Sequence, residues 1–208
     1  MYIKYQNCLL IPLFFAASIS ASDTYYPSGE WQKTSPESQS IDQAKVNKII
    51  DLSFTDESTQ GIVIIKNGKI IGERYADGYD SKSHGTSWSM AKSYYAALIG
   101  ISIEKGEIDS LDDPVGKYLD YFNDERSKIT IRDLLDMSSG LDFPEDEHER
   151  MFFQRNHLDY AKSVGVEKDA GLKWEYNNVN SMIIGDILHS VTGIKADKLL
   201  SQRIFEPI

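Results

Sequence analysis

The stretch "TSWSMAKSYYAALIGISIEKGE", residues 86–107, carries a serine and a lysine at the start of a long apolar segment. The spacing of its apolar residues predicts a helix that begins between Ser87 and Ser89 and ends near Gly106. Ser89 and Lys92 are three residues apart, so their side chains share one face of this helix. We expect Ser89 in the first turn, where unpaired backbone N–H groups and the positive end of the helix dipole favour developing negative charge.

This pair has the chemistry of an activated nucleophile. A serine hydroxyl reacts readily only when a neighbouring base takes its proton, and a lysine can be that base when burial or nearby cations lower its pKa. The same letters recur as Ser102 and Lys105, near the helix C-terminus, where the dipole disfavours an oxyanion, and no role is predicted for this copy. Taken alone, the motif is equally compatible with a capping serine beside a solvated lysine.

Composition limits the possible partners. The 208 residues contain 22 basic and 32 acidic side chains, which gives a formal net charge of -10. Such a balance argues against a nucleic-acid partner and against binding to an anionic membrane surface. Hydrophobic residues make up 41% of the chain, enough for the core of one large domain.

The N-terminus has the features of a signal peptide over residues 1–21. Lys4 precedes the apolar run "CLLIPLFFAASIS", which is too short for a confident membrane span, and small residues follow it. Cleavage is expected near Ser20, Ala21 or Ser22, and an uncleaved membrane anchor is the alternative. The expected location is therefore periplasmic or secreted, without stable membrane association after cleavage.

The single cysteine of the chain, Cys8, lies inside this leader. A mature exported chain would therefore have no disulfide, no cysteine nucleophile and no thiolate metal site.

Residues 22–40 are rich in serine, proline and polar side chains, which indicates an extended arm ahead of the domain at 41–208. Ser40 or Asp42 can cap a helix that runs to about Phe54. The apolar face of this helix is predicted to consist of Val46, Ile49, Ile50 and Phe54.

Two β-rich runs, 61–66 and 69–75, flank Asn67-Gly68, a strong short-range signal for a hairpin with a two-residue turn. A lone hairpin is marginally stable, so this one needs further strands or helices against its face.

Several segments together resemble the serine β-lactamase and penicillin-binding protein superfamily. They are "WSMAKSYYAALIGISIEKGEIDSLDDPVGKYL", "ITIRDLLDMSSGL" and "LKWEYNNVNSMIIGDILHSVTG". The closest similarity is to class C-like hydrolases, which include DD-peptidases, esterases and 6-aminohexanoate-dimer hydrolase. The resemblance implies an α+β, β-lactamase/transpeptidase-like fold: an N-terminal hairpin belonging to an antiparallel sheet, plus a mostly helical region.

The family's second motif, Y-x-N, matches Tyr176-Asn177-Asn178, which lies 87 residues after Ser89 (176 - 89 = 87) and precedes a predicted helix. Tyr121 begins the same pattern of letters but follows the serine too soon. The simpler interpretation of the later match is a half-buried tyrosine at a helix start, with Asn177 or Asn178 as the cap.

The resemblance also implies the roles of these residues. Ser89 would be the nucleophile and Tyr176 would accept and return its proton, with Lys92 holding Tyr176 in its basic form. Asn178 would bind the substrate carbonyl. The backbone N–H of Ser89 would form one half of the oxyanion hole. The resemblance calls for no metal ion and no cofactor.

The third motif of the family, K-T-G or H-x-G on a late strand, has no counterpart after Tyr176, where only 208 - 176 = 32 residues follow. We therefore expect an incomplete domain without its C-terminal strands, from a truncated reading frame or a partial gene model.

A separate segment, "PEDEHERMFFQRNH", holds His148 and His157 without a standard metal-ligand spacing, and is expected to be a solvated loop or short helix beside the cleft. His189 is expected at the surface or in packing.

The predicted function is an exported serine hydrolase that acts on a small-molecule amide or ester through an acyl-serine intermediate, and these 208 residues alone are expected to be inactive. A catalytically dead penicillin-binding-like or ligand-binding envelope protein is the alternative, because it would keep the cleft without turnover. The acyl group and the oligomeric state are left open by the sequence.

Overall fold

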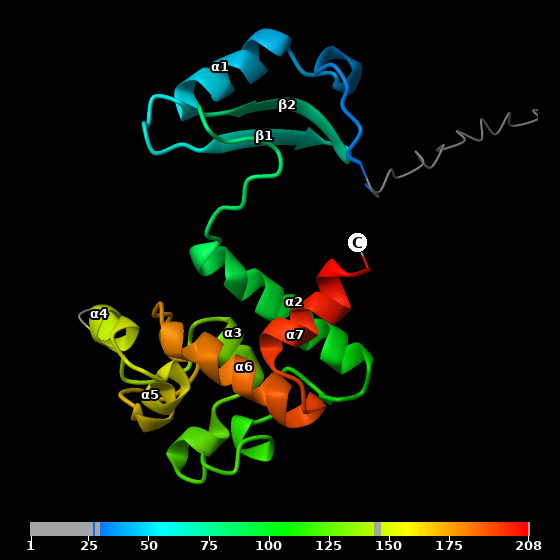
Figure 1. Cartoon of the computed structure of the whole chain (residues 1–208). Coiled ribbons are helices and arrows are strands. Elements are labelled where there is room, and N and C mark those ends of the chain that lie inside the picture. The colour runs from blue at the N-terminus through cyan, green and yellow to red at the C-terminus, as the bar shows by residue number, and fades with distance from the viewer. Residues whose placement is uncertain (1–26, 28–29, 144–146, 208) are drawn as a thin grey trace, which may run out of the picture. The chain divides into compact units, whose positions relative to one another are not determined.

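The computed structural model describes residues 27, 30–143 and 147–207, and the chain divides into two compact units between Ser83 and His84 (Figure 1). The first unit is a helix packed on a two-stranded sheet, and the second is built from helices. The predicted signal peptide, residues 1–21, lies outside the described residues, as does part of the predicted arm at 22–40.

The elements of the first unit are the 3-10 turn η1 (Glu37–Gln39), the helix α1 (Gln43–Ser53) and the strands β1 (Gly61–Lys66) and β2 (Lys69–Tyr75). Those of the second unit are η2 (Trp88–Met90), α2 (Ala91–Glu104), η3 (Val115–Lys117), η4 (Glu125–Lys128), α3 (Ile131–Leu135), α4 (Glu147–Phe152), α5 (His157–Ser163), α6 (Asn178–Thr192), α7 (Ala196–Leu200) and η5 (Ser201–Phe205), the last a π-helical turn.

The hairpin has the predicted bounds and turn. Asn67 and Gly68 have φ angles of 50° and 75°, so both turn residues are left-handed, as a type I′ turn requires. The antiparallel register pairs Gly61 with Tyr75 and contains a bulge where the pairing shifts between Ile64 and Ile65. The sequence prediction for residues 61–75 is confirmed.

Helix α1 lies across one face of this hairpin (Figure 1). Asp42 is its N-cap, since the carboxylate accepts hydrogen bonds from the N–H groups of Ala44 (2.7 Å) and Lys45 (3.3 Å). Val46 and Ile50 are buried together with Ile71 of the sheet, whereas Ile49, predicted on the same apolar face, is 50% exposed. The physical reason is that a two-stranded sheet is narrow and contacts only one stripe of the helix.

The second unit is organised around α6, which contacts α2, α3, α5 and α7. Helix α6 buries side chains on several sides rather than on one stripe, as expected of a helix surrounded by others. Its buried apolar residues are Val179, Ile183, Ile184, Ile187 and Leu188.

Helix α2 begins later than the sequence predicted. Residues Trp88–Met90 form a 3-10 turn, and regular α-helix starts at Ala91, so Ser89 lies in the turn that leads into α2. Trp88 has a φ of 45°, in the left-handed region, and a helix cannot continue through a non-glycine residue in that conformation without strain. The C-terminal end agrees with the prediction, because Lys105 is the C-cap and Gly106 has a φ of 71°.

Within the described ranges, no helix is both long enough and apolar enough to cross a membrane.

Candidate active site

Three of the predicted site residues meet at one oxygen atom. The Ser89 Oγ lies 2.5 Å from the Tyr176 hydroxyl oxygen, although the two residues are 87 positions apart. The Lys92 Nζ donates a hydrogen bond to the same Ser89 oxygen at 3.1 Å. The lysine also lies over the tyrosine ring, 4.9 Å from its centroid. The turn before α2, the first turn of α2 and the segment before α6 therefore bring a serine hydroxyl, a lysine ammonium and a phenol into direct contact.

Hydrogen bonds fix the residues on both sides of Tyr176. The N–H of Glu175 donates to the carbonyl of Met137 at 2.8 Å. Asn177 is buried, its amide nitrogen donates to the carbonyl of Leu141 (3.2 Å), and its amide oxygen caps α6 by accepting from the N–H of Val179 (2.9 Å). Asn177 is thus the helix cap, which leaves Asn178 in the first turn of α6.

A second buried amide anchors the same end of α6. Asn180 has no solvent exposure, donates to the carbonyl of Leu134 (3.2 Å) and accepts from the hydroxyl of Ser139 (2.7 Å). Leaving either buried group without a partner would cost about 1–3 kcal/mol. Sequence reasoning missed this residue; a polar residue between apolar helix positions was the available signal.

The environment of Tyr176 favours its ionised form. Burial raises the pKa of the phenol, but its hydrogen bonds with Lys92 and Ser89 and the charge of Lys92 act in the opposite direction. Together they outweigh burial, and the pKa of Tyr176 is lowered from the ordinary value for tyrosine. A phenol poised in this way can accept a proton from the serine more readily than an isolated tyrosine can.

A cavity of about 410 Å³ adjoins Ser89 between α2 and α6. From α2, Lys92 and Tyr95 line it, and from α6, Asn178 and Met182 do so. Asn178, predicted to bind substrate, therefore lines the same cavity as Ser89. This volume is in the range of pockets that bind small molecules, about 300–1,000 Å³.

The cavity is also lined by Trp88 and by three residues of the segment expected beside the cleft. These three are Met151, Phe152 and the exposed His157. The rings of Trp88 and Phe152 meet edge to face, with centroids 6.4 Å apart and planes at 85°. The prediction of a short helix beside the cleft holds for this segment, which forms α4 and the start of α5. The side chain of His148 lies outside the described residues.

The residues that repeat the motif letters have structural partners instead. Ser102 is buried and accepts a hydrogen bond from Arg203 at 3.0 Å. Tyr121 donates to Asp186 at 2.8 Å, and burial, followed by this contact, raises the pKa of Tyr121 far above its ordinary value. Ser102 and Tyr121 thus bond to Arg203 and Asp186 rather than to Ser89.

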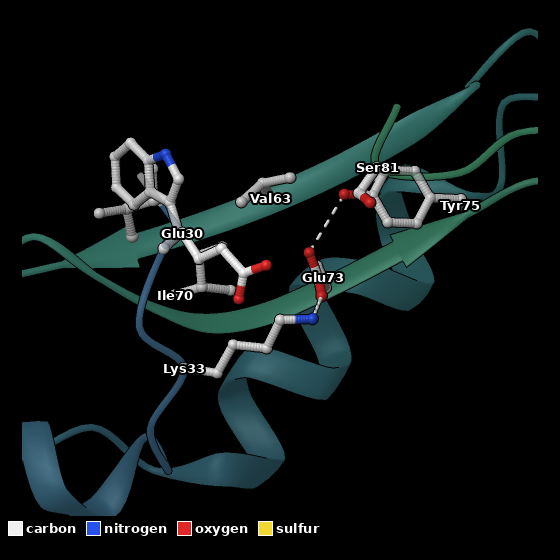
Figure 2. A pocket seen from close by; sticks show the side chains of 9 residues that line it. Glu30, Lys33, Val63, Ile70, Glu73, Tyr75 and Ser81 are labelled. Atoms are coloured by element: carbon white, nitrogen blue, oxygen red, sulfur yellow. Dashed lines mark hydrogen bonds and ion pairs between the residues drawn. The ribbon is translucent and has the colours of Figure 1, made fainter. Parts of the chain in front are cut away.

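A different hollow, of about 640 Å³, lies on the face of the hairpin opposite α1 (Figure 2). Three charged side chains line it: Glu30, Lys33 and Glu73. Glu73 forms an ion pair with Lys33 and accepts a hydrogen bond from the Tyr75 hydroxyl at 3.1 Å. These contacts hold the pKa of Glu73 below its ordinary value, mainly through Lys33.

The described part of the chain contains no group of three or more His, Cys, Asp or Glu residues arranged to hold a metal ion.

A hairpin covered by a helix, and a helical unit in which a serine contacts a lysine and a tyrosine, together define a β-lactamase/transpeptidase-like fold. The chain belongs to the Beta-lactamase family, whose model matches residues 54–208.

Similar proteins agree with this assignment. The chain is 24% identical to a candidate D-alanyl-D-alanine carboxypeptidase of Salmonella heidelberg (strain SL476), covering 96% of this chain and 54% of that protein. It is 25% identical to the crystal structure of a candidate β-lactamase from Bacteroides dorei DSM 17855, with a TM-score of 0.67 and coverage of 80% and 51%. The D-amino acid amidase of Ochrobactrum anthropi SV3 gives a TM-score of 0.58 at 22% identity, with coverage of 78% and 52%. The chain thus spans about half the length of these relatives.

Proposed function

We propose that the chain is the part of a serine hydrolase that carries the nucleophile and its acid–base partner, and that the substrate is a small amide or ester. The observation that carries this proposal is the contact of one oxygen, Ser89 Oγ, with both Tyr176 and Lys92. The names of the relatives, a carboxypeptidase and an amidase, support cleavage of an acyl bond.

The first half of the reaction would form an acyl-serine. Tyr176, as phenolate, takes the hydroxyl proton while the Ser89 oxygen bonds to the substrate carbonyl carbon. The carbonyl oxygen becomes an oxyanion near the N-terminal end of α2, where backbone N–H groups favour negative charge. The intermediate collapses when the bond to the amine or alkoxide breaks, and the leaving group takes the proton from Tyr176.

The second half would regenerate the serine. Water loses a proton to Tyr176 and attacks the acyl carbon, and the ester bond to Ser89 then breaks. The serine oxygen recovers its proton from Tyr176, and the acid product leaves. Lys92 supports both halves of the reaction. Its positive charge favours the phenolate form of Tyr176, and its ammonium group stays hydrogen-bonded to the Ser89 oxygen.

We further propose that residues 1–208 on their own acylate slowly and turn over little. The motif that supplies a second oxyanion donor in the family is not found after Tyr176 in this sequence. Removal of one such donor costs about 10²–10³ in rate. The alternative, an envelope protein that binds or is acylated without turnover, predicts a stable acyl-serine.

The test is covalent labelling of the 208-residue chain with a fluorophosphonate, followed by intact mass and peptide mapping. We expect one adduct, on Ser89, that Ser89→Ala abolishes and Ser102→Ala does not. Labelling that persists in Ser89→Ala would overturn the proposed nucleophile. If the gene continues past codon 208, an ester-hydrolysis assay of the longer product distinguishes the two alternatives. Turnover supports the hydrolase, and a stable acyl-serine without turnover supports the binding protein.

Export of the protein is also a proposal, based on the apolar run that follows Lys4. Expression in a bacterium with a periplasm should give a mature N-terminus near residues 20–22, readable by mass spectrometry of the periplasmic fraction. Full-length protein retained in the membrane fraction would instead favour the uncleaved anchor.

A further inference from the structure

We propose that Met137 is a positioning residue, which holds Tyr176 at the distance from Ser89 and Lys92 that proton transfer requires. This inference rests on the proposed function and adds a residue that acts through Tyr176 rather than on the substrate. It follows from three observations: the backbone conformation of Met137, its contacts on both sides of Tyr176, and the exposure of the segment that carries Tyr176.

The backbone of Met137 closes α3 in a conformation that usually requires glycine. Asp136 is the C-cap of α3, and Met137 follows it with a φ of 58°. The N–H of Met137 donates to the carbonyl of Leu134 (3.4 Å), and the N–H of Ser138 donates to that of Asp133 (2.8 Å). These two bonds form a Schellman motif, in which glycine is the usual left-handed residue. A methionine there is strained, and strain of this kind is retained where the side chain has another use.

Met137 contacts the chain on both sides of Tyr176. Its carbonyl oxygen accepts a hydrogen bond from the N–H of Glu175 at 2.8 Å. Its sulfur accepts from the side-chain nitrogen of Asn180 at 3.6 Å. Asn180 is fully buried in the first turn of α6. The carbonyl of Met137 therefore fixes the residue before Tyr176, and its side chain contacts the helix that follows Tyr176.

Side-chain packing restrains the segment before Tyr176 only weakly. Leu172 is 74% exposed and Trp174 is 66% exposed, so neither large apolar side chain anchors this segment in the core. The backbone hydrogen bond between Glu175 and Met137 thus supplies a restraint that packing does not.

The charges around Tyr176 make its acidity depend on its position. Burial raises the pKa of Tyr176, and its contacts with Lys92 on α2 lower it. Glu175, next to the tyrosine, is paired with Lys168 (3.2 Å) and Lys173 (3.4 Å), which balance its charge. Moving Tyr176 away from Lys92 would weaken the contacts that lower the pKa while burial continues to raise it. Proton transfer would then be slower and would need a higher pH.

The test compares Met137→Gly with Ser40→Gly in the 208-residue chain. Ser40 is the matched control, because it is also a non-glycine residue with a φ of 58° and lies at the end of η1 in the first unit. Both changes relieve a left-handed side chain. Only Met137→Gly also frees the carbonyl that holds Glu175 and deletes the sulfur contact with Asn180. The measurements are the melting temperature and the rate constant of acylation by p-nitrophenyl phenylacetate, followed by intact mass across a range of pH.

We expect Met137→Gly to acylate Ser89 about tenfold or more slowly than the parent chain, since misplacing a catalytic group by about 1 Å can cost about 10²-fold. The melting temperature should stay close to that of the parent, because glycine suits the left-handed position. The rise of the pH–rate profile should move to higher pH as Tyr176 loses part of the effect of Lys92. Ser40→Gly should change neither the rate nor the profile.

Met137→Leu tests the side chain without freeing the backbone. Leucine has a similar volume and keeps the restraint of a non-glycine residue, so this variant should acylate faster than Met137→Gly, with a profile near that of the parent. Three results for Met137→Gly would overturn the inference and leave the proposed function intact: the parent rate, a slower rate with an unshifted profile, or a slower rate matched by a fall in melting temperature. A Met137→Leu variant no faster than Met137→Gly would also contradict it. Failure of the parent chain to acylate Ser89 would overturn the proposed function itself.

Discussion

A double-mutant cycle on Lys92 and Tyr176 addresses the central contact of the site. Tyr176→Phe removes only the hydroxyl that lies 2.5 Å from Ser89 Oγ, and Lys92→Met removes the ammonium that donates to the same oxygen at 3.1 Å while keeping an unbranched side chain. Each change deletes one partner of a single proton transfer, and neither leaves a large cavity. The cycle also includes the double variant.

The expected magnitudes follow from this shared atom. Each single change should slow acylation of Ser89 by about 10²-fold or more, the loss for a positioned acid–base group. Independent contributions would multiply, giving about 10⁴-fold or more for the double variant. Because both groups act on one oxygen, we expect the double variant to stay within about tenfold of the slower single variant. For two 10²-fold losses and no further loss in the double variant, the coupling free energy is about 2.7 kcal/mol.

The assay is acylation of the 208-residue chain by p-nitrophenyl phenylacetate, measured by intact mass so that slow reactions remain visible. Lys105→Met and Tyr121→Phe are the matched controls, because they make the same chemical changes in the two copies of the motif letters that do not contact Ser89. Both controls should acylate at nearly the parent rate. Multiplicative losses in the double variant, or a single variant at the parent rate, would refute the shared proton transfer.

The remaining predictions concern pH and stability. In a pH–rate profile, acylation should rise as Tyr176 ionises, at a lower pH than an ordinary tyrosine would give. Lys92→Met removes the contacts of Lys92 that lower the pKa of Tyr176, while burial continues to raise it. The rise should therefore move to higher pH in this variant. Gly140→Ala should destabilise the chain well beyond Gly193→Ala in thermal unfolding. Both glycines have φ near 70°, which costs an alanine about 1–2 kcal/mol, but only at Gly140 would a Cβ lie 2.0 Å from a backbone oxygen, while nothing lies within 4 Å at Gly193. Asn177→Ala should lower the melting temperature, because it removes the oxygen that caps α6 and the amide that donates to the carbonyl of Leu141; an unchanged melting temperature would contradict the cap.

Local patterns in the sequence were sufficient for the elements whose physics is local. Asn67-Gly68 predicted the hairpin and its turn, because a type I′ turn needs two left-handed residues and this pair supplies them. Ser40 and Asp42 were the two predicted caps of α1, and the structure has Asp42, whose carboxylate accepts from N–H groups two and three residues ahead. The exposure of Ile49 was not predictable in this way, because it depends on the width of the surface that α1 meets.

The spacing of the motif residues located the candidate site along the chain, and the family resemblance supplied their roles. Three features required the tertiary structure: the backbone conformation before Ser89, the contacts that hold the start of α6, and the cavity beside Ser89. The left-handed Trp88 places Ser89 in a 3-10 turn ahead of α2. The hydrogen bonds of Asn177 and Asn180 to the 134–141 segment fix the end of α6.

The cavity beside Ser89 is the clearest case of what the sequence could not decide. It joins residues of α2 and α6 to aromatic residues near α4, and no periodicity relates these segments to one another. By itself, the sequence determined which residues could do chemistry, because reactivity belongs to residue types and short spacings. Only the packing of helices around α6 decided which side chains meet at Ser89 and what surrounds them, because contacts between distant segments depend on the whole core.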